Sequence, residues 1–386
     1  MGRLLAGGVV ALLLAVCSVA CSLIPLRPAT SPSDSGDSHW LVSRLTAVVA
    51  AGDRAGYDAL FTGDADAGIR GWIWTNLRLF PGVNFSTDSA GNLVAAWRSD
   101  LDSLPIKNRV GSISCVDATG CRVTDLGPQP GVVAPIWAVQ PLQVARQGTV
   151  QVLAPVSGAG LVGWMSAAQA AQKTLAGLPL GQLKDNWDGN AVVEFPVDAN
   201  AFAQRFGETS PAAYVNIGAI TQLQAQFRDP GQGSVAWTKF TAHVVVNPMT
   251  TGGLTQDQQV FLLTHELVHV ATSAWPIAAG ATWVSEGLAE SVAMDAVAGE
   301  GAKDWTSAKA ACTATGLAVP GDDEYTSGDA KLQTAAYAVG GALVGLVRRH
   351  MGDAANDALL ALRQGKPADG VDLATWALAW CKKSGE

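Results

Sequence analysis

The sequence predicts an α+β fold in two parts, and three observations lead to this prediction. Helix-like segments followed by short alternating segments occupy the chain up to residue 155, an order typical of α+β domains. Beyond residue 248 the periodicity is almost entirely helical. A glycine-rich stretch over residues 156–160 separates the parts. We therefore expect an N-terminal α+β accessory domain over residues 39–155 and a second domain over residues 156–386, with a small sheet and a mostly helical C-terminal part.

The first part begins with two expected helices, at residues 40–51 and 54–61, separated by Gly52-Asp53. Alternating apolar and polar residues predict strands at residues 93–97, 110–116, 131–139 and 149–153. The opening, with Ala50-Ala51-Gly52-Asp53 before a helix and then Leu60-Phe61, resembles NTF2-like domains. No residues there form a catalytic constellation, so we interpret this part as a spacer, a substrate-guiding surface or a latch over the second domain.

The second part begins with an amphipathic helix expected at residues 161–178. Strands are expected at residues 191–197 and 214–217, with a helix at residues 201–206 between them. A further strand over residues 241–248 ends at a proline. The helices that follow are expected at residues 255–271, 282–297, 304–314, 329–351, 354–363 and 373–381.

The helix at residues 255–271 contains His265-Glu266-Leu267-Val268-His269. Thr255 and Gln258 form a capping box at its start, which supports the helical prediction. Residues four apart lie on one face of a helix, so His265 and His269 can offer two imidazole nitrogens to one metal ion. Glu266 lies beside them and is the candidate general base. The competing interpretation is a pair of hydrogen-bonded core histidines.

The next helix, which begins near residue 282, supplies Glu286 as a plausible third ligand. Two histidines, one carboxylate and an open fourth position are typical of a catalytic Zn²⁺ site and not of a structural one. Glu290 lies four residues further along the same face. It can accept the free ring N–H of His265 or His269 and so orient the ligand, although a solvated glutamate is the simpler alternative.

The pattern His265-Glu266-x-x-His269, followed by Trp283-x-x-Glu286-Gly287-x-Ala289-Glu290, resembles the gluzincin metallopeptidases and is most similar to bacterial peptidase MA-like domains. The spacer between the second histidine and the glutamate is slightly shorter than in the best-known members. The resemblance implies Zn²⁺-dependent hydrolysis of a peptide or protein substrate, with Glu266 as the base.

Two further segments carry the same resemblance. Tyr337-Ala338-Val339-Gly340 resembles the Tyr-x-x-Gly of aminopeptidase-like gluzincins, which implies that Tyr337 stabilises the oxyanion; Tyr325 is the alternative donor. The strand at residues 241–248 is similar to the edge strand that holds extended substrate in this family. His243, within that strand, is expected to be structural, and His39 and His350 are expected at the surface.

A different class of function is a zinc-binding lipoprotein that is catalytically latent or inactive and acts as a binding or scaffold module. The presence of Glu266 argues against this alternative, because a protein that only binds metal has no need of the base. Nucleic-acid binding is not expected, since the formal net charge is −8 and no basic cluster occurs. The chain is 48% hydrophobic, which is sufficient for two domains with cores.

The N-terminus has the features of an export signal. Arg3 precedes an apolar run over residues 4–20, and the run ends in Ser18-Val19-Ala20-Cys21. Small residues before a cysteine resemble a bacterial lipoprotein signal, which implies removal of residues 1–20, a lipid on Cys21 and anchoring to the outer face of the cytoplasmic membrane. Cys17 is an alternative lipidation site. The alternatives to a lipoprotein are a secreted protein cleaved after Ala20 and an uncleaved membrane anchor.

Residues 21–38 are rich in proline and serine and are expected to form a flexible tether. No other segment is predicted to span a membrane. Four cysteines remain outside the leader, an even number that favours disulfides in an exported chain: Cys115, Cys121, Cys312 and Cys381. Of the three possible connectivities we favour Cys115–Cys121 with Cys312–Cys381.

Overall fold

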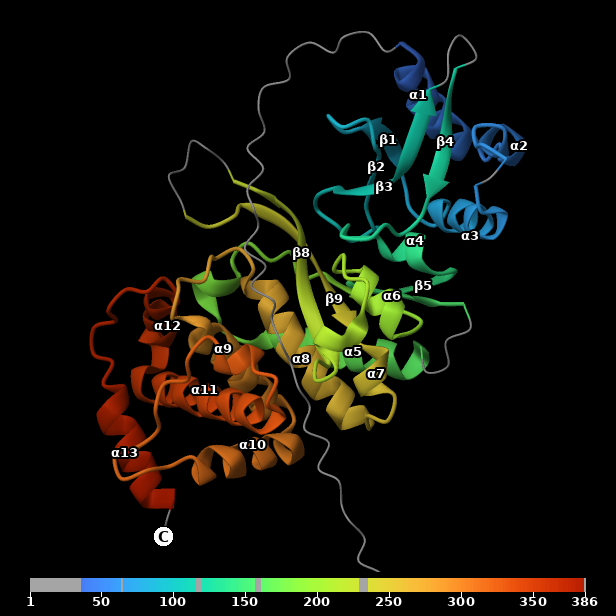
Figure 1. The fold of residues 1–386 in the computed structure, drawn as a ribbon. Helices are drawn as coiled ribbons and strands as arrows, with labels where there is room; N and C mark the ends of the chain where they lie inside the picture. The colour runs from blue at the N-terminus through green and yellow to red at the C-terminus, as the bar shows by residue number, and fades with distance from the viewer. Residues whose placement is uncertain (1–35, 64, 116–119, 157–160, 229–234, 385–386) are drawn as a thin grey trace, which may run out of the picture.

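Two sheets organise the fold, which confirms the α+β class (Figure 1). The structure is a computed structural model that describes residues 36–384 apart from residues 64, 116–119, 157–160 and 229–234. One sheet has four strands in the order β1-β2-β3-β4, and the other has five in the order β5-β6-β7-β9-β8. Figure 1 shows helices α9 to α13 gathered at the opposite end of the molecule from the first sheet.

The first sheet is an antiparallel meander of β1 (Asn84–Thr87), β2 (Leu93–Trp97), β3 (Ile106–Cys115) and β4 (Cys121–Leu126). One apolar cluster joins it to three helices, α1 (Gly36–Ala51), α2 (Arg54–Asp58) and α3 (Ala67–Leu77). The predicted Cys115–Cys121 disulfide is confirmed and links paired residues at the ends of β3 and β4.

The strand predicted at residues 131–139 is wrong. Residues 131–135 are irregular, and a short helix, α4 (Ile136–Val139), follows Pro135. Proline has no N–H to donate to a sheet ladder, which explains why the segment does not pair as a central strand. All four residues of α4 are buried, so the apolar run reflects burial on every side and not alternation.

The second sheet is mixed. β5 and β6 form an antiparallel hairpin, β6, β7 and β9 run parallel, and β8 pairs antiparallel with β9. Its strands are β5 (Leu142–Gln147), β6 (Val150–Pro155), β7 (Ala191–Glu194), β8 (Ala219–Phe227) and β9 (Lys239–Val246). The edge strands are therefore β5 and β8, and the expectation that the strand at residues 241–248 lies at an edge is wrong.

The predicted domain boundary after residue 155 needs a correction. β6 pairs with β7, with Val150 opposite Ala191, so the hairpin β5–β6 belongs to the second sheet. The sheets thus divide in the connection between β4 and β5. The apolar cluster of the first part also takes in Leu153 and Val192, so the second sheet is covered on both faces. A sequence pattern shows that a strand exists but not which strand it pairs with.

The strand predicted at residues 214–217 is also displaced. A 3-10 turn, η3 (Pro211–Tyr214), occupies this position because Ser210 caps the turn and Pro211 opens it. The strand starts two residues beyond the predicted end, at Ala219 of β8. The short helix between the strands is confirmed as α6 (Ala199–Gln204).

Most helices of the second part lie close to their predicted ranges. The helix predicted at residues 304–314 is displaced to residues 298–310, because Val297 alone has the non-helical backbone that separates it from the preceding helix. The short helix at residues 248–251 was not predicted. The helices of this part are α5 (Leu161–Gly177), α7 (Pro248–Thr251), α8 (Gln256–Thr272), α9 (Thr282–Ala296), α10 (Ala298–Ala310), α11 (Ala330–Met351), α12 (Ala355–Arg363) and α13 (Leu373–Ser384). Three further 3-10 turns are η2 (Gly181–Lys184), η4 (Glu324–Thr326) and η5 (Gly352–Ala354). The predicted Cys312–Cys381 disulfide is confirmed and ties the segment after α10 to α13.

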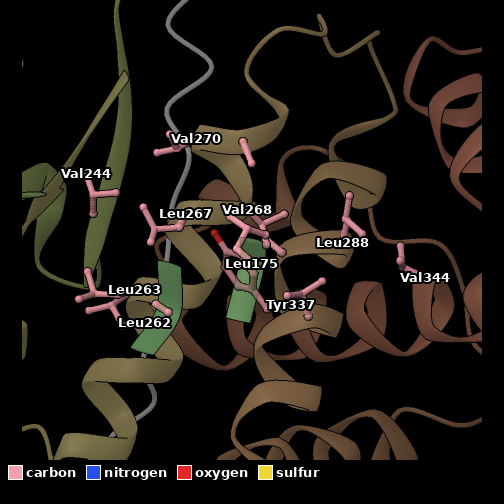
Figure 2. Packing of buried hydrophobic residues seen from close by; sticks show 14 of the residues in the cluster. Leu175, Val244, Leu262, Leu263, Leu267, Val268, Val270, Leu288, Tyr337 and Val344 are labelled. Carbon is pink, nitrogen blue, oxygen red and sulfur yellow. The ribbon is translucent and has the colours of Figure 1, made fainter. Parts of the chain in front are cut away.

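One buried cluster holds α5, α8, α9 and α11 against the second sheet. Figure 2 shows part of it, with Val244 of β9 facing Leu263 and Leu267 of α8. Helix α8 thus lies between the sheet and the C-terminal helices. The stretch Ala330–Arg363 is long and apolar enough to cross a membrane, contrary to our prediction for this region. Its most apolar window is 72% buried, as expected for a core helix.

Candidate metal centre

Helix α8 presents its two histidines side by side. The capping box between Thr255 and Gln258 is present and fixes where the helix starts. His265 and His269 follow one turn apart, with ring centroids 4.9 Å apart and their Nε2 atoms 3.1 Å apart. Both side chains are buried, His265 completely. The helix therefore directs two imidazole nitrogens to one point in the core.

Helix α9 brings Glu286 to the same point. Its Oε2 lies 3.4 Å from Nε2 of His265 and 3.3 Å from Nε2 of His269. Neither carboxylate oxygen has a hydrogen-bond partner among the described residues. The structure thus brings the three predicted ligands together in a buried group that could hold a metal ion.

The electrostatics of this group favour a cation at its centre. Burial raises the pKa of Glu286, but the neighbouring imidazoles, His269 foremost, outweigh burial and lower the pKa to about 2. Burial lowers the pKa of His265, but its contacts with Glu286 and Glu290 raise the pKa to about 10. The site therefore attracts positive charge, which either protons or a metal ion could supply.

Glu290 lies where the motif predicts, with Oε2 2.8 Å from Nδ1 of His265. This contact turns Nε2 of His265 toward the ligand group. Asp304 of α10, which no sequence motif predicts, lies beside Glu290. Burial and the Glu290 carboxylate raise the pKa of Asp304 well above its ordinary value. No spacing rule connects Asp304 to the motif, because its position depends on how α10 packs.

Glu266 is fully buried next to the ligand residues. Its Oε2 accepts a hydrogen bond from Thr221 Oγ1 at 2.7 Å, whereas Oε1 has no partner in the described part of the chain. Burial raises the pKa of Glu266, although His269, His265 and the Thr221 hydroxyl oppose the increase. Thr221 belongs to β8, a strand whose position was predicted wrongly, and no motif singles it out.

The two candidate tyrosines differ in how their hydroxyls are used. Tyr325 donates to the carbonyl of Ala336 at 3.1 Å. The Tyr337 hydroxyl is buried without a partner among the described groups, and its ring lies 5.8 Å from the ring of His265. Burial raises the pKa of both phenols well above the ordinary value, so both keep their protons. Tyr337 is therefore the phenol free to donate next to the ligands.

Two further residues that no sequence motif predicts, Ser285 and Arg363, lie on the Nδ1 side of His269. Ser285 Oγ is 3.5 Å from His269 Nδ1, and Arg363 Nη1 donates to Ser285 Oγ at 3.1 Å. Burial lowers the pKa of Arg363 to about 10, although the Glu286 carboxylate opposes the decrease, and the guanidinium remains charged at neutral pH.

The remaining histidines do not join the site. His243 of β9 contacts Glu194 and Asp102 through its two ring nitrogens, at 2.7 and 2.8 Å. Its neighbour Val244 packs toward α8, so His243 points to the opposite face of the sheet. His39 and His350 are exposed, as predicted.

The predicted lipidation site Cys21 and its alternative Cys17 lie outside the described residues. The two disulfides indicate that the chain matures in an oxidising compartment.

No protein-family model matches this chain, and comparison with curated proteins finds no significant match.

Proposed function

We propose that this protein is a zinc-dependent peptidase that hydrolyses peptide bonds outside the cytoplasm. The observation that carries the proposal is the gathering of unpartnered buried groups around one point. The Glu286 carboxylate, Oε1 of Glu266 and the Tyr337 hydroxyl all lack hydrogen-bond partners among the described residues, and all lie on or beside the histidine pair. Buried polar atoms without partners are uncommon in native proteins and point to a functional role.

The donor set fits zinc. A tetrahedral Zn²⁺ with ligand bonds of about 2.0–2.1 Å keeps neighbouring ligand atoms about 3.3–3.4 Å apart. The three distances among the Nε2 atoms and Glu286 Oε2 are 3.1, 3.4 and 3.3 Å. Two imidazoles and one carboxylate leave the fourth position of a tetrahedron open, as in catalytic zinc sites.

His265, His269 and Glu286 would hold the zinc, which supplies Lewis-acid activation of a water molecule and of the scissile carbonyl. Glu266 takes the proton from that water and passes it to the leaving amine, a role suited to a buried carboxylate with a raised pKa. Tyr337 donates its phenol proton in a hydrogen bond to the oxyanion as the carbonyl carbon becomes tetrahedral.

The experiment combines zinc content with turnover in the purified full-length protein. We expect about one zinc per chain, lost in Glu286→Ala, because a two-ligand site binds weakly. Glu266→Gln should retain zinc and lose peptide hydrolysis by about 10²-fold or more. Glu300→Gln, on the outer helix α10, serves as the control and should match the parent. Hydrolysis at the parental rate by Glu266→Gln would refute the assignment of the base.

The burial of the site favours one alternative function. His265, Glu266 and Glu286 are at most 1% exposed. A zinc-loaded but latent lipoprotein that acts as a binding or scaffold module accounts for the same geometry. A mixed peptide library separates the two proposals: the peptidase cleaves it in a Glu266-dependent manner, and the latent protein binds zinc without cleaving.

We further propose that Cys21 carries a lipid that anchors the protein to the outer face of the bacterial cytoplasmic membrane. Disulfides in the chain agree with export. Cys21→Ala should move the protein from the membrane fraction to the soluble fraction. A parent protein found in the soluble fraction, with a mature N-terminus at residue 21 and no lipid, would support the secreted alternative.

A further inference from the structure

Arg363 is a buried arginine at the end of α12, far along the chain from the metal ligands. Its side chain donates to the backbone carbonyls of Thr272 and Trp275 at 3.3 and 3.0 Å, where α8 ends. A separate bond, from Nη1, reaches Ser285 Oγ on α9 at 3.1 Å. Arg363 is only 4% exposed. One guanidinium therefore joins the ends of the two helices that carry all three ligands.

Ser285 lies between Arg363 and His269. Its Oγ is 3.5 Å from His269 Nδ1, at the outer limit of a hydrogen bond. Because Nε2 of His269 faces the other ligands, Nδ1 is the ring nitrogen left to carry the proton. The hydroxyl oxygen has two lone pairs and can accept from the imidazole on one side and from the guanidinium on the other.

The two histidines are thus oriented in different ways. His265 donates to a carboxylate, Glu290, whereas His269 faces a neutral hydroxyl that is itself held by a cation. A hydroxyl on a flexible rotamer orients a ring poorly unless something fixes it, and Arg363 supplies that fixed contact. A buried cation also needs a compensating charge, and the Glu286 carboxylate is the anion that acts on it.

We propose that Arg363 is a positioning residue of the metal centre, which acts through Ser285 to fix the ring of His269. The inference rests on the proposed zinc function but concerns how the site is held and not which reaction it performs. Its competitor is a purely structural role, in which Arg363 caps the last carbonyls of α8 and has no effect on the metal.

The test measures how fast zinc leaves the purified full-length protein for an excess of chelator. Ser285→Ala removes the serine contact and leaves the bonds of Arg363 to α8 in place. We expect it to raise the zinc dissociation rate about 10- to 100-fold, the usual effect of losing the partner of a ligand histidine. Arg363→Met should give a similar increase, and the double variant no more than the larger single effect, because both residues act in one chain of contacts.

Arg348→Met is the matched control. Arg348 also donates to a serine of α9, Ser291, at 2.7 Å, but no contact from that serine to a histidine is present in the described structure. This control should release zinc at the parental rate. Cobalt in place of zinc gives a second readout, because its visible absorption band reports ligand orientation and should change in Ser285→Ala but not in Arg348→Met.

Parental release rates and cobalt spectra in Ser285→Ala would overturn the inference, whether or not Arg363→Met folds. Increases that multiply in the double variant would also overturn it, since they mean independent actions. Failure of the proposed function is visible separately: a parent that binds no zinc refutes the metal centre itself, and with it the role of Arg363. If Ser285→Ala or Arg363→Met loses peptidase activity but releases zinc at the parental rate, the zinc site stands and Arg363 does not position its histidine.

Discussion

At the scale of single residues, the most informative atoms are those left without partners. Glu266 has one carboxylate oxygen bound to Thr221 and the other free, and the Tyr337 hydroxyl is buried and unpaired among the described residues. Each such group costs about 1–3 kcal/mol relative to a satisfied one. A fold keeps this cost where a bound partner removes it, which agrees with a site that a cation and a substrate complete.

Thr221 gives a prediction that tests the environment of Glu266. Its hydroxyl lowers the pKa of Glu266 against the burial that raises it. Thr221→Val removes the hydroxyl at nearly constant volume, so the pKa of Glu266 should rise further. Glu266 works as a base only when ionised, so the acidic limb of kcat/KM should move to higher pH.

The measurement is the pH profile of kcat/KM for the parent, Thr221→Val and a control, Thr238→Val. Thr238 is a threonine of the same sheet region whose hydroxyl donates to the Phe227 carbonyl, away from the site. An acidic limb that stays in place in Thr221→Val would mean that Glu266 does not set it.

The residues found from the sequence and those missed differ in one physical respect. His265, His269, Glu286 and Glu290 follow helical spacing, and a helix fixes relative side-chain positions over one or two turns. Arg363 reaches the site from a separate helix, and Thr221 and Asp304 likewise depend on packing between elements. Local periodicity holds no information on such contacts, so only the tertiary structure reveals them.

At the scale of elements, the contact between α9 and α11 sets the geometry of the site. A Cβ on Gly287 would lie 2.4 Å from the carbonyl oxygen of Gly340, and one on Gly341 would lie 2.9 Å from Cγ of Glu290. The helices therefore pack backbone against backbone. This approach brings Tyr337, one turn before Gly340, next to the ligands on the other helices.

Gly287→Ala should separate these helices. The added methyl group meets backbone, which cannot rotate away, so we expect a loss of about 1–3 kcal/mol in the free energy of unfolding. Gly299→Ala is the control, since nothing lies within 4 Å of its added Cβ and alanine favours a helix. Thermal unfolding and zinc content measure both effects. A Gly287→Ala protein as stable as Gly299→Ala, with full zinc, would contradict the role of this contact.

Helices were predicted more accurately than strands, because the contacts that define a helix are close together in the sequence. The capping box at Thr255 fixes the start of α8 within four residues of sequence. Strand pairing depends on partners far along the chain, so the predicted strand at residues 214–217 missed β8, and β6 was assigned to the first domain. The prolines at positions 135 and 211 were the local signals against two of the predicted strands.

At the scale of the whole molecule, a buried charged cluster joins the two parts of the chain. Asp102, from the loop after β2, contacts His243 of the second sheet, and His243 contacts Glu194, which pairs with Arg205. These four groups sum to zero charge only when His243 is protonated. A further contact between the two parts is the hydrogen bond that Ser103 Oγ donates to the backbone carbonyl of Phe240 at 2.7 Å. The N-terminal part is therefore fixed to the sheet that supports α8.

This cluster predicts how stability depends on pH. Burial alone would lower the pKa of His243, but Asp102 and Glu194 outweigh it and raise the pKa from 6.5 to about 9. Folding therefore takes up a proton between these values. The resulting stabilisation is complete below pH 6.5 and is lost as pH rises through 9; it is on the order of 3 kcal/mol. His243→Gln should be less stable than the parent near pH 6, because Asp102 and Glu194 then face a single cation, Arg205.

Denaturant unfolding at pH 6 and pH 9 measures this difference, with the exposed His350→Gln as the control. The parent and the control should lose stability between the two pH values, whereas His243→Gln should change less. Equal slopes in all three proteins would show that another group governs the alkaline loss. The expected result would mean that protonation of His243 on folding stabilises the contact between the two parts of the chain. The sheet stabilised in this way carries Thr221 and packs against the metal-ligand helix α8.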